Sequence, residues 1–335
     1  MDVKRVLTVF RQPNLWARLQ LYRDVQTGVR LQFLYFAVES GLLQALRAPI
    51  SRDELVKQLG VKHSELLGVA LDLGVALKEL SLRDGRYAVT GRRARALLGP
   101  DGDTLAATIQ EFVAYHGSVY QELAARLGGA PPGDYLDRFG TVIARSSRVL
   151  EPFIANFVKT TAKSSTPVRL LEIGCGSGIY LRYAAQANPQ LTGIALDMER
   201  RVAEQALANL REWGLADRFK VLTGDIRQPP AEVAGPFDLV TLHNNVYYFT
   251  PEERPTLFGR IRSWLAPGGA LALTTLMRGT TLTALDFDLA LRCTEGCTPL
   301  PEIAELTAQL RQGGFTTVEH SRLMPFEPLY SLTAR

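Results

Sequence analysis

The chain has 335 residues, of which 46% are hydrophobic and 21% are charged, so it can bury the core of one large domain or of two ordinary ones. The formal net charge of +4 is small for this length and does not by itself indicate a surface for nucleic acid. An odd, low count of 3 cysteines excludes a disulfide framework and fits a reducing compartment, and too few histidines lie near the cysteines to predict a metal site. No secretory signal and no stretch of about 18 apolar residues is visible, so we predict a cytoplasmic protein without a membrane partner.

The first part of the chain has mostly helical patterns. Residues 14–47 are predicted to form one or two helices with an apolar stripe. Ser51, with a glutamate three residues later, has the spacing of a capping box and predicts a helix start. A further helix is expected over about 64–80, and an Asp-Gly turn between two apolar runs predicts a hairpin over 82–89. Short helices followed by a hairpin predict a winged-helix-like domain over 1–100. The stripe consists of Leu15, Leu19, Val25, Val29, Phe33 and Phe36.

A winged-helix pattern is typical either of DNA binding or of an interaction module. The helix over 64–80 would be the recognition helix, and base readout requires Arg, Lys, Asn or Gln on it. It contains one Lys and three acidic residues instead. We therefore interpret residues 1–100 as an interaction or dimerisation module and expect no nucleic-acid partner.

Residues 101–164 are predicted to be helical, with a Gly- and Pro-rich turn at 128–133. A helical segment between a small domain and a larger one often forms the wall of a pocket. His116 is therefore a candidate catalytic residue, and Tyr120 and Arg145 are candidate substrate contacts.

Residues 165–335 alternate between strand and helix patterns, which predicts a Rossmann-like, doubly wound α/β domain with a mostly parallel sheet. The expected strands are 168–173, 191–196, 219–223, 237–242, 270–275, 316–322 and 328–334, and the expected helices are 178–187, 200–212, 252–265 and 303–312.

The first of these strands ends in a glycine-rich loop that contains Gly174, Gly176 and Gly178. Glycines let the backbone turn sharply and approach a ligand, and the N-terminus of the following helix favours an anionic group. A nicotinamide protein would have the spacing G-x-G-x-x-G. Here the spacing is G-x-G-x-G, and Glu172 lies two residues before the first glycine.

Two acidic residues follow the next two strands. Asp197 is placed to accept hydrogen bonds from a ribose, and Asp225 to accept one from an adenine amino group. Met198, which follows Asp197, is a candidate for packing against the adenine. A second acid at the position of Asp225 is not part of the nicotinamide pattern.

Together these motifs resemble the class I S-adenosylmethionine-dependent methyltransferases. The whole chain resembles their two-domain small-molecule O-methyltransferases, and this resemblance implies a homodimer through residues 1–100, which would be the dimerisation domain. The resemblance implies S-adenosyl-L-methionine as the cofactor, with Glu172 and the three glycines around its methionine part. It implies that Asp197 binds the ribose and that Asp225 and Ile226 bind the adenine. It also places His243 and Asn244 beside the sulfonium.

The sequence departs from that family where a His-Asp-Trp run supplies the general base, because the matching run here is Tyr247-Tyr248-Phe249. Three explanations remain open. His243 or His116 is the base, the acceptor needs no base, or the acceptor is a carbon atom. Tyr247 is a candidate for orienting the acceptor or contacting the sulfonium by a cation–π interaction, and Tyr248 is a candidate substrate contact.

The sequence thus predicts an enzyme that methylates a small molecule, plausibly in natural-product biosynthesis, with oxygen slightly favoured over carbon or nitrogen as acceptor. The alternatives are an NAD-dependent oxidoreductase, disfavoured by the glycine spacing, and a non-catalytic winged-helix regulator that senses S-adenosylmethionine, disfavoured by the acidic recognition helix.

Overall fold

The computed structural model describes residues 13–335, which fall into two compact units. Unit 1 takes in the chain up to Tyr120 together with Thr141–Val149. Unit 2 comprises Gln121–Gly140 and Leu150–Arg335. The helical connection between the two units is therefore shared, and the predicted boundaries at 100 and 164 stay a prediction. None of the helices within residues 13–335 is both long enough and apolar enough to cross a membrane.

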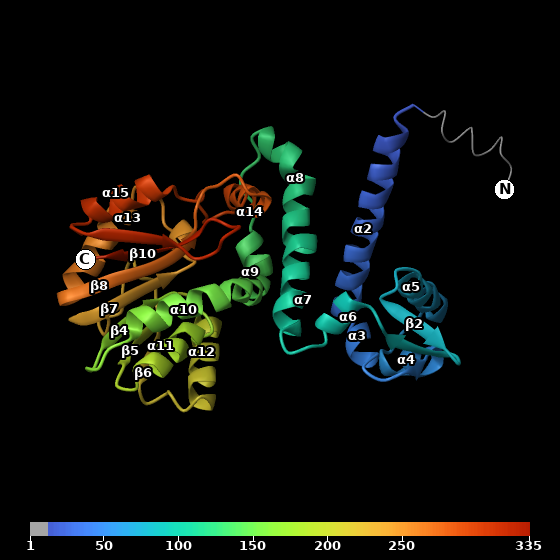
Figure 1. Cartoon of the computed structure of the whole chain (residues 1–335), viewed down its shortest axis with the longest axis horizontal. Helices are drawn as coiled ribbons and strands as arrows, with labels where there is room; N and C mark the ends of the chain where they lie inside the picture. The colour runs from blue at the N-terminus through green and yellow to red at the C-terminus, as the bar shows by residue number, and fades with distance from the viewer. Residues whose placement is uncertain (1–12) are drawn as a thin grey trace. The chain divides into compact units, whose positions relative to one another are not determined.

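Unit 1 contains the predicted helices and hairpin, which lie at the right of Figure 1. Ser51 begins α4 with a complete capping box, in which Ser51 and Glu54 bond each other's backbone N–H groups. The hairpin turns at Asp84 and Gly85, both with positive φ, as a two-residue hairpin loop requires. The first elements are α2 (Leu15–Glu39), α3 (Leu42–Ala45), β1 (Ile50–Ser51), α4 (Arg52–Gln58), α5 (Ser64–Ala76), β2 (Leu80–Arg83), β3 (Arg86–Val89) and α6 (Arg92–Ala96).

The segment after α6 is helical, as predicted, and includes one π-helical turn. Its elements are α7 (Gly102–Gln110), the π-helix Glu111–His116, α8 (Gly117–Leu127), α9 (Tyr135–Ser146), a 3₁₀ turn over Ser147–Leu150 and α10 (Glu151–Ala162).

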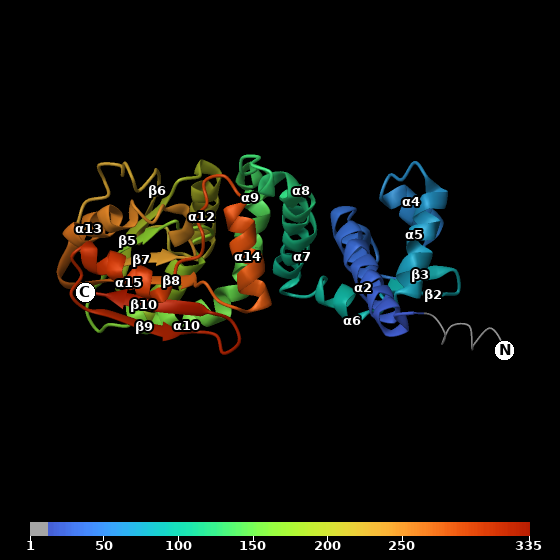
Figure 2. The ribbon, with the colours of Figure 1, turned by 90° about the horizontal axis from the view of Figure 1, so that it is seen from above.

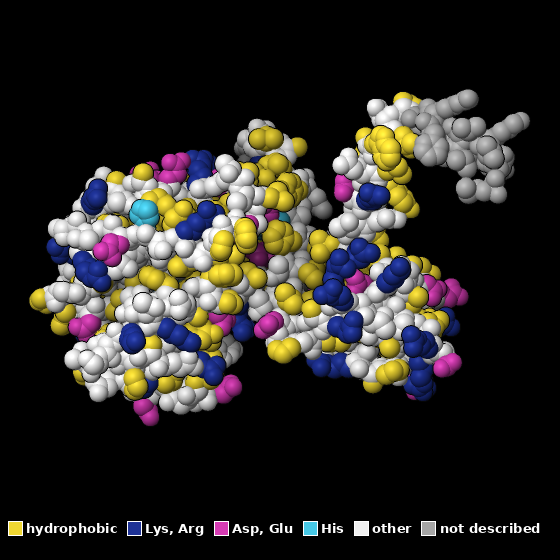
Figure 3. Space-filling model, in the orientation of Figure 1, with side chains coloured by type: hydrophobic (Ala, Val, Ile, Leu, Met, Phe, Trp, Pro, Cys, Tyr) yellow, Lys and Arg dark blue, Asp and Glu magenta, His cyan; other side chains and the backbone are white. Residues whose placement is uncertain are grey.

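The apolar stripe predicted on α2 is mostly at the surface, so it is not a core face. Phe33 is buried, but Leu19, Val25, Val29 and Phe36 are exposed. Hydrophobic side chains are visible along α2 in Figure 3. Part of the stripe lines a groove of about 820 Å³ between α2 and α5, whose walls include Val29, Phe36, Leu66, Leu67 and Leu73.

Unit 2 is built on a seven-stranded sheet with the order β6-β5-β4-β7-β8-β10-β9. In Figure 2 the strands run from β6 at one edge to β9 at the other. The five strands from β6 to β8 are parallel, and β10 is antiparallel to both its neighbours. The strands are β4 (Arg169–Ile173), β5 (Thr192–Asp197), β6 (Phe219–Thr223), β7 (Phe237–His243), β8 (Leu265–Leu276), β9 (Val318–Arg322) and β10 (Leu329–Ala334).

The chain moves from β4 through β5 to β6 in one direction and from β7 to β8 in the other, so the strand order reverses between β4 and β7. Right-handed crossovers then place helices on both faces of the sheet. Figure 1 shows α10, α11 and α12 on one face and α13 and α15 on the other. Their bounds are α11 (Ile179–Ala187), α12 (Arg200–Glu212), α13 (Arg254–Trp264) and α15 (Ile303–Gln312).

One helix of unit 2 was not expected from the sequence. The helix α14 spans Leu282–Arg292, and the Thr281 side chain caps it by accepting a hydrogen bond from the Ala284 N–H. Its apolar residues are split between buried Ala284, Ala290 and Leu291 and exposed Leu282 and Leu285.

Candidate functional site

The glycine-rich loop connects β4 to α11 at the carboxyl edge of the sheet, beside the point where the strand order reverses. Ligands of open α/β sheets bind at this point. Gly174 has a φ of +68°, and a Cβ on it would lie 2.3 Å from Asn245 Nδ2, so only glycine fits. Gly176 has a φ of +55° with no atom within 4 Å of an added Cβ, so its backbone faces open space. Gly178 also has positive φ, at the start of α11.

Asp197 ends β5 and holds this loop in place. Its Oδ2 accepts a hydrogen bond of 2.9 Å from the Gly176 N–H, and its Oδ1 accepts one of 3.0 Å from the Glu199 N–H. Burial raises the pKa of the Asp197 carboxyl, and these backbone N–H groups oppose that shift. Each carboxylate oxygen retains a further lone pair for a ligand hydroxyl.

Asp225, the other predicted acid, follows β6 and is bonded to a neighbouring arginine. Asp225 accepts a hydrogen bond of 2.8 Å from the Arg227 N–H and lies 3.5 Å from the Arg227 guanidinium. Ile226 is packed in the hydrophobic core of unit 2, whereas Met198 is 60% exposed. Of the two residues predicted to pack against adenine, only Met198 therefore has a largely accessible side chain.

The end of β7 lies directly beside the end of β4. The Asn245 Nδ2 donates a hydrogen bond of 2.7 Å to the carbonyl of Ile173, the last residue of β4. Asn244 has a φ of +53° and donates its backbone N–H to the Thr274 carbonyl. The predicted residues after β4 and β7 are thus brought together at the same edge of the sheet.

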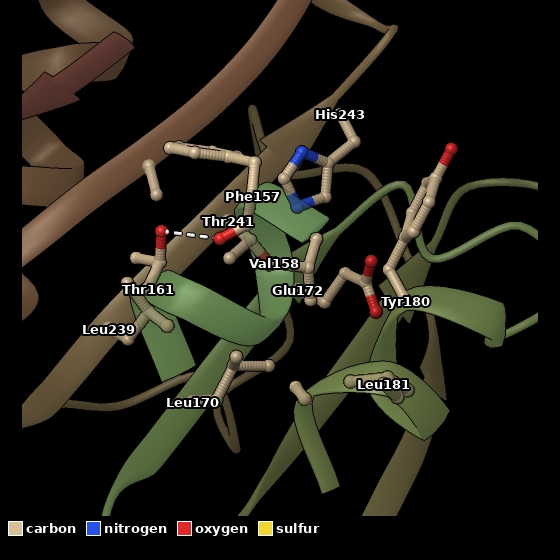
Figure 4. Close-up of a pocket in the computed structure, with 12 residues that line it drawn as sticks. Phe157, Val158, Thr161, Leu170, Glu172, Tyr180, Leu181, Leu239, Thr241 and His243 are labelled. Atoms are coloured by element: carbon tan, nitrogen blue, oxygen red, sulfur yellow. Dashed lines mark hydrogen bonds between the residues drawn. The ribbon is translucent and has the colours of Figure 1, made fainter. Parts of the chain in front are cut away.

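A small cavity lies under this edge, on the face of the sheet that α10 and α11 cover. Its volume is about 10 Å³, which is room for about one water molecule. Figure 4 shows Glu172 and Tyr180 on one side of it and His243 above. Neither oxygen of Glu172, nor Thr241 Oγ1, nor His243 Nε2 has a hydrogen-bond partner within residues 13–335.

Burial at this cavity shifts the pKa values of Glu172 and His243 in opposite directions. Burial, followed by the nearby charge of Asp197, raises the pKa of Glu172 well above its ordinary value. Burial lowers the pKa of His243 to about 3. His243 Nδ1 lies 3.0 Å from Thr274 Oγ1, and its ring packs edge-on against Tyr180. The neutral forms of both side chains are therefore favoured in the folded protein.

The two tyrosines of the segment after β7 have different exposures. Tyr247 is buried and makes edge-to-face ring contacts with Phe287 of α14 and with Tyr248. Tyr248 is half-buried. They lie in a 3₁₀ turn over Val246–Tyr248.

The remaining predicted residues belong to unit 1. His116 is buried at the end of the π-helix, with its Nε2 3.8 Å from Glu111 Oε1. Tyr120 is 54% exposed on α8. Arg145 is paired with Asp103 at 2.6 Å and donates to Gln110 at 3.2 Å, so its guanidinium already has an acidic partner within unit 1.

Several residues that shape this site carried no signal in the sequence. Asn245 joins β4 to β7, and Arg227 joins the Asp225 loop to the Tyr248 carbonyl. Arg254 is buried and joins the Phe249 carbonyl to Thr298. Each acts through a contact with a distant part of the chain, which local spacing does not reveal.

Comparison with known proteins agrees with this geometry. Residues 170–269 match the family described as "Methyltransferase domain". The demethylspheroidene O-methyltransferase of Cereibacter sphaeroides is 27% identical over 280 residues, which are 78% of this chain and 71% of that protein. The ubiquinone biosynthesis O-methyltransferase of Bordetella bronchiseptica is 30% identical over 202 residues, which are 55% of this chain and 78% of that protein.

Solved structures show the same fold over nearly the whole chain. The mitomycin 7-O-methyltransferase MmcR superposes with a TM-score of 0.78 and 19% identity, covering 95% of this chain and 97% of that one. The structure described as "PigF with SAH" has a TM-score of 0.76 and 18% identity, covering 95% and 99%. This chain matches the methyltransferase domain and is 30% identical to the Bordetella bronchiseptica enzyme over 78% of that enzyme's length. It therefore belongs to the class I S-adenosylmethionine-dependent methyltransferases.

Proposed function

We propose that the enzyme transfers the methyl group of S-adenosyl-L-methionine to an oxygen atom of a small molecule, in the biosynthesis of a natural product. The observation that carries this proposal is that the glycine loop, Asp197 and the end of β7 meet where the strand order reverses. The names of the relatives, which are O-methyltransferases acting on demethylspheroidene or in ubiquinone biosynthesis, support oxygen as the acceptor atom.

The residues present fit the cofactor. The two buried oxygens of Glu172 lack donors within the described chain, and an ammonium group supplies donors. The backbone at Gly176 is open to an approaching ligand. We propose that Glu172, Gly174, Gly176 and Gly178 hold the methionine part and that Asp197 holds the ribose. Under the same proposal, the adenine binds beside Met198, Asp225 and Ile226, and the sulfonium lies beside His243 and Asn244.

The bound cofactor supplies an already activated methyl group on its sulfonium. The protein then has to align the acceptor oxygen at roughly 3 Å and receive its proton. A histidine with a pKa of about 3 is a weak proton acceptor near neutral pH, so the burial of His243 favours a positioning role. His116 is the other histidine predicted as a candidate base, and its Nε2 lies 3.8 Å from Glu111 Oε1. We therefore propose His116 as the base.

Turnover of two alanine variants distinguishes the histidines. We expect His116→Ala to lower turnover roughly 10²-fold and His243→Ala to lower it less, measured with a panel of small phenols. The affinity for S-adenosylhomocysteine serves as the control for an intact cofactor site. A loss of about 10² in His243→Ala alone would assign the base to His243. Normal turnover in both variants would favour an acceptor that needs no base.

Unit 1 is proposed to form a homodimer. Its groove of about 820 Å³ and the exposed face of α2 present apolar side chains to solvent. A contiguous exposed apolar patch of this kind marks an interaction site.

All three cysteines are free thiols, which supports a location in the reducing cytoplasm.

Calorimetry with two ligands tests the proposed cofactor. S-adenosylhomocysteine should bind to the purified protein and NAD should not. Binding of NAD alone would overturn the proposal in favour of an oxidoreductase.

A further inference from the structure

The 3₁₀ turn after β7 is held at three successive backbone carbonyls. The last carbonyls of a helical turn have no partner within it and are usually bound by water or by a cap. Here the carbonyls of Tyr247, Tyr248 and Phe249 each accept a hydrogen bond from a different side chain. The donors are Thr298, Arg227 and Arg254, from three separate segments of unit 2. We call these three residues the carbonyl clamp.

Arg254, on α13, is the most deeply buried member of the carbonyl clamp, with none of its surface exposed. Its Nε donates to the Phe249 carbonyl at 3.0 Å and its Nη2 donates to Thr298 Oγ1 at 2.9 Å. Its Nη1 lies 3.6 Å from Glu305. Burial lowers the pKa of Arg254, and a buried charge is tolerated only when it is paired and hydrogen-bonded. The planar fork of an arginine is therefore used here to hold two groups at fixed positions.

Thr298 completes the link between Arg254 and the turn. Its backbone N–H donates to the Tyr247 carbonyl at 2.8 Å, and its hydroxyl lies 3.0 Å from the same carbonyl. The hydroxyl accepts from Arg254, so its one proton is free to be donated to the Tyr247 carbonyl or to the Phe249 carbonyl, which lies 3.3 Å away. Asp288 of α14 holds this loop by accepting the Leu300 N–H at 2.8 Å.

Arg227 joins the turn to the loop that carries Asp225. Its Nη2 donates to the Tyr248 carbonyl at 2.6 Å, and its Nε donates to Glu253 at 2.8 Å. Its guanidinium stacks over the Phe249 ring at 4.8 Å and lies 3.5 Å from Asp225. The two segments proposed to flank the cofactor are therefore tied to each other.

We infer that Arg254, Thr298 and Arg227 are positioning residues that fix the rings of Tyr247 and Tyr248 against the sulfonium of the cofactor. The inference rests on the proposed function, which places the sulfonium beside His243 and Asn244. The turn with both tyrosines follows these residues in the chain, and the Tyr248 N–H donates to the Asn245 carbonyl at 3.1 Å. A cation over an aromatic ring is stabilised only within about 6 Å of the ring centroid, so a small shift of the turn weakens the contact. The hydrogen bonds of the carbonyl clamp thereby hold the two rings where they can contact a positively charged ligand.

Two ligands that differ in that charge provide the test. S-adenosylmethionine carries the sulfonium and S-adenosylhomocysteine does not, so the ratio of their affinities reports on the aromatic contact. We expect Arg254→Lys and Thr298→Val to lower the affinity for S-adenosylmethionine relative to S-adenosylhomocysteine by about threefold or more. Thr298→Ser keeps the hydroxyl and should restore the wild-type ratio. Arg262→Lys is the matched control, since Arg262 also lies on α13 and donates to the carbonyl of Gly314, away from the turn.

Hydrogen exchange of the ligand-free protein gives an independent measurement. The amides of Tyr248, Phe249 and Thr298 should exchange faster in Arg254→Lys and Thr298→Val than in wild type and in Arg262→Lys. An unchanged affinity ratio in both clamp variants, or equal loss of both affinities, would overturn the inference, as would unchanged exchange. If wild type binds neither ligand, the proposed function fails and with it the sulfonium contact, whereas the exchange data still decide whether the clamp holds the turn.

Discussion

Both carboxylate oxygens of Asp197 accept backbone hydrogen bonds, so replacing one oxygen by an amide nitrogen should disrupt the loop. In Asp197→Asn, one of the two backbone N–H groups from Gly176 and Glu199 would face an amide donor instead of an acceptor. We expect the affinity for S-adenosylhomocysteine to fall about tenfold or more, since a buried donor left unsatisfied costs roughly 1–3 kcal/mol. Calorimetry would measure this, with the exposed Asp217→Asn as control. Equal affinities in the two variants would exclude Asp197 from the site.

Gly174 combines a strained backbone position with a close neighbour. Gly174→Ala would place a Cβ 2.3 Å from Asn245 Nδ2 at a φ of +68°. Gly214 has the same φ of +68°, but nothing lies within 4 Å of its added Cβ, so Gly214→Ala is a matched control for the backbone strain alone. Both variants should lose about 1–3 kcal/mol of stability from strain, and Gly174→Ala should lose clearly more because of the contact. Thermal unfolding that shifts both equally would contradict this.

At the scale of elements, alternation along β4 and β7 puts Glu172, Thr241 and His243 on the face that α10 and α11 cover. The same alternation that builds a hydrophobic face elsewhere has here placed polar groups in the interior. Because Glu172 and His243 are buried in their neutral forms, the stability of the fold should depend on pH.

The pKa of Glu172 is raised in the folded state, and its effect has a definite sign. Below the unfolded pKa of about 4.5, Glu172 is protonated in both states and burial carries no ionisation cost. As pH rises above that value, only the unfolded state ionises freely, so stability is lost until the folded pKa is reached. Glu172→Gln should therefore raise the melting temperature of the ligand-free protein more at pH 8 than at pH 5. A shift that is the same at both pH values would show that Glu172 ionises normally when folded.

At the scale of the whole molecule, unit 1 exposes large apolar side chains along α2 and α5. Leu66 lines the groove between α2 and α5 and is 69% exposed, so a charge there is compatible with folding of the single chain. We expect the wild-type protein to be a dimer by light scattering and Leu66→Glu to be a monomer. Leu282→Glu, at a position of unit 2 that is 84% exposed, should remain a dimer. A wild-type monomer would refute the proposed dimer.

Local chemistry was sufficient to predict most of the elements. The capping box at Ser51, the Asp-Gly turn and the alternation after residue 165 each act over a few residues, and each led to the correct element. The helix α14 was missed, and α2 was assigned a stripe that turned out to be exposed. Apolar spacing indicates which side chains share a face, but it does not distinguish a core from an interface.

The sequence by itself determined the fold class and the family, because glycine spacing and strand-end acids are short-range patterns that a cofactor loop requires. Only the tertiary structure decided that Glu172 and His243 share a buried cavity, that Arg145 is already paired with Asp103, and that three side chains hold the turn with the tyrosines. Protonation and positioning depend on burial and on partners far away in the chain. These are set by how the strands and helices pack, which no local pattern encodes.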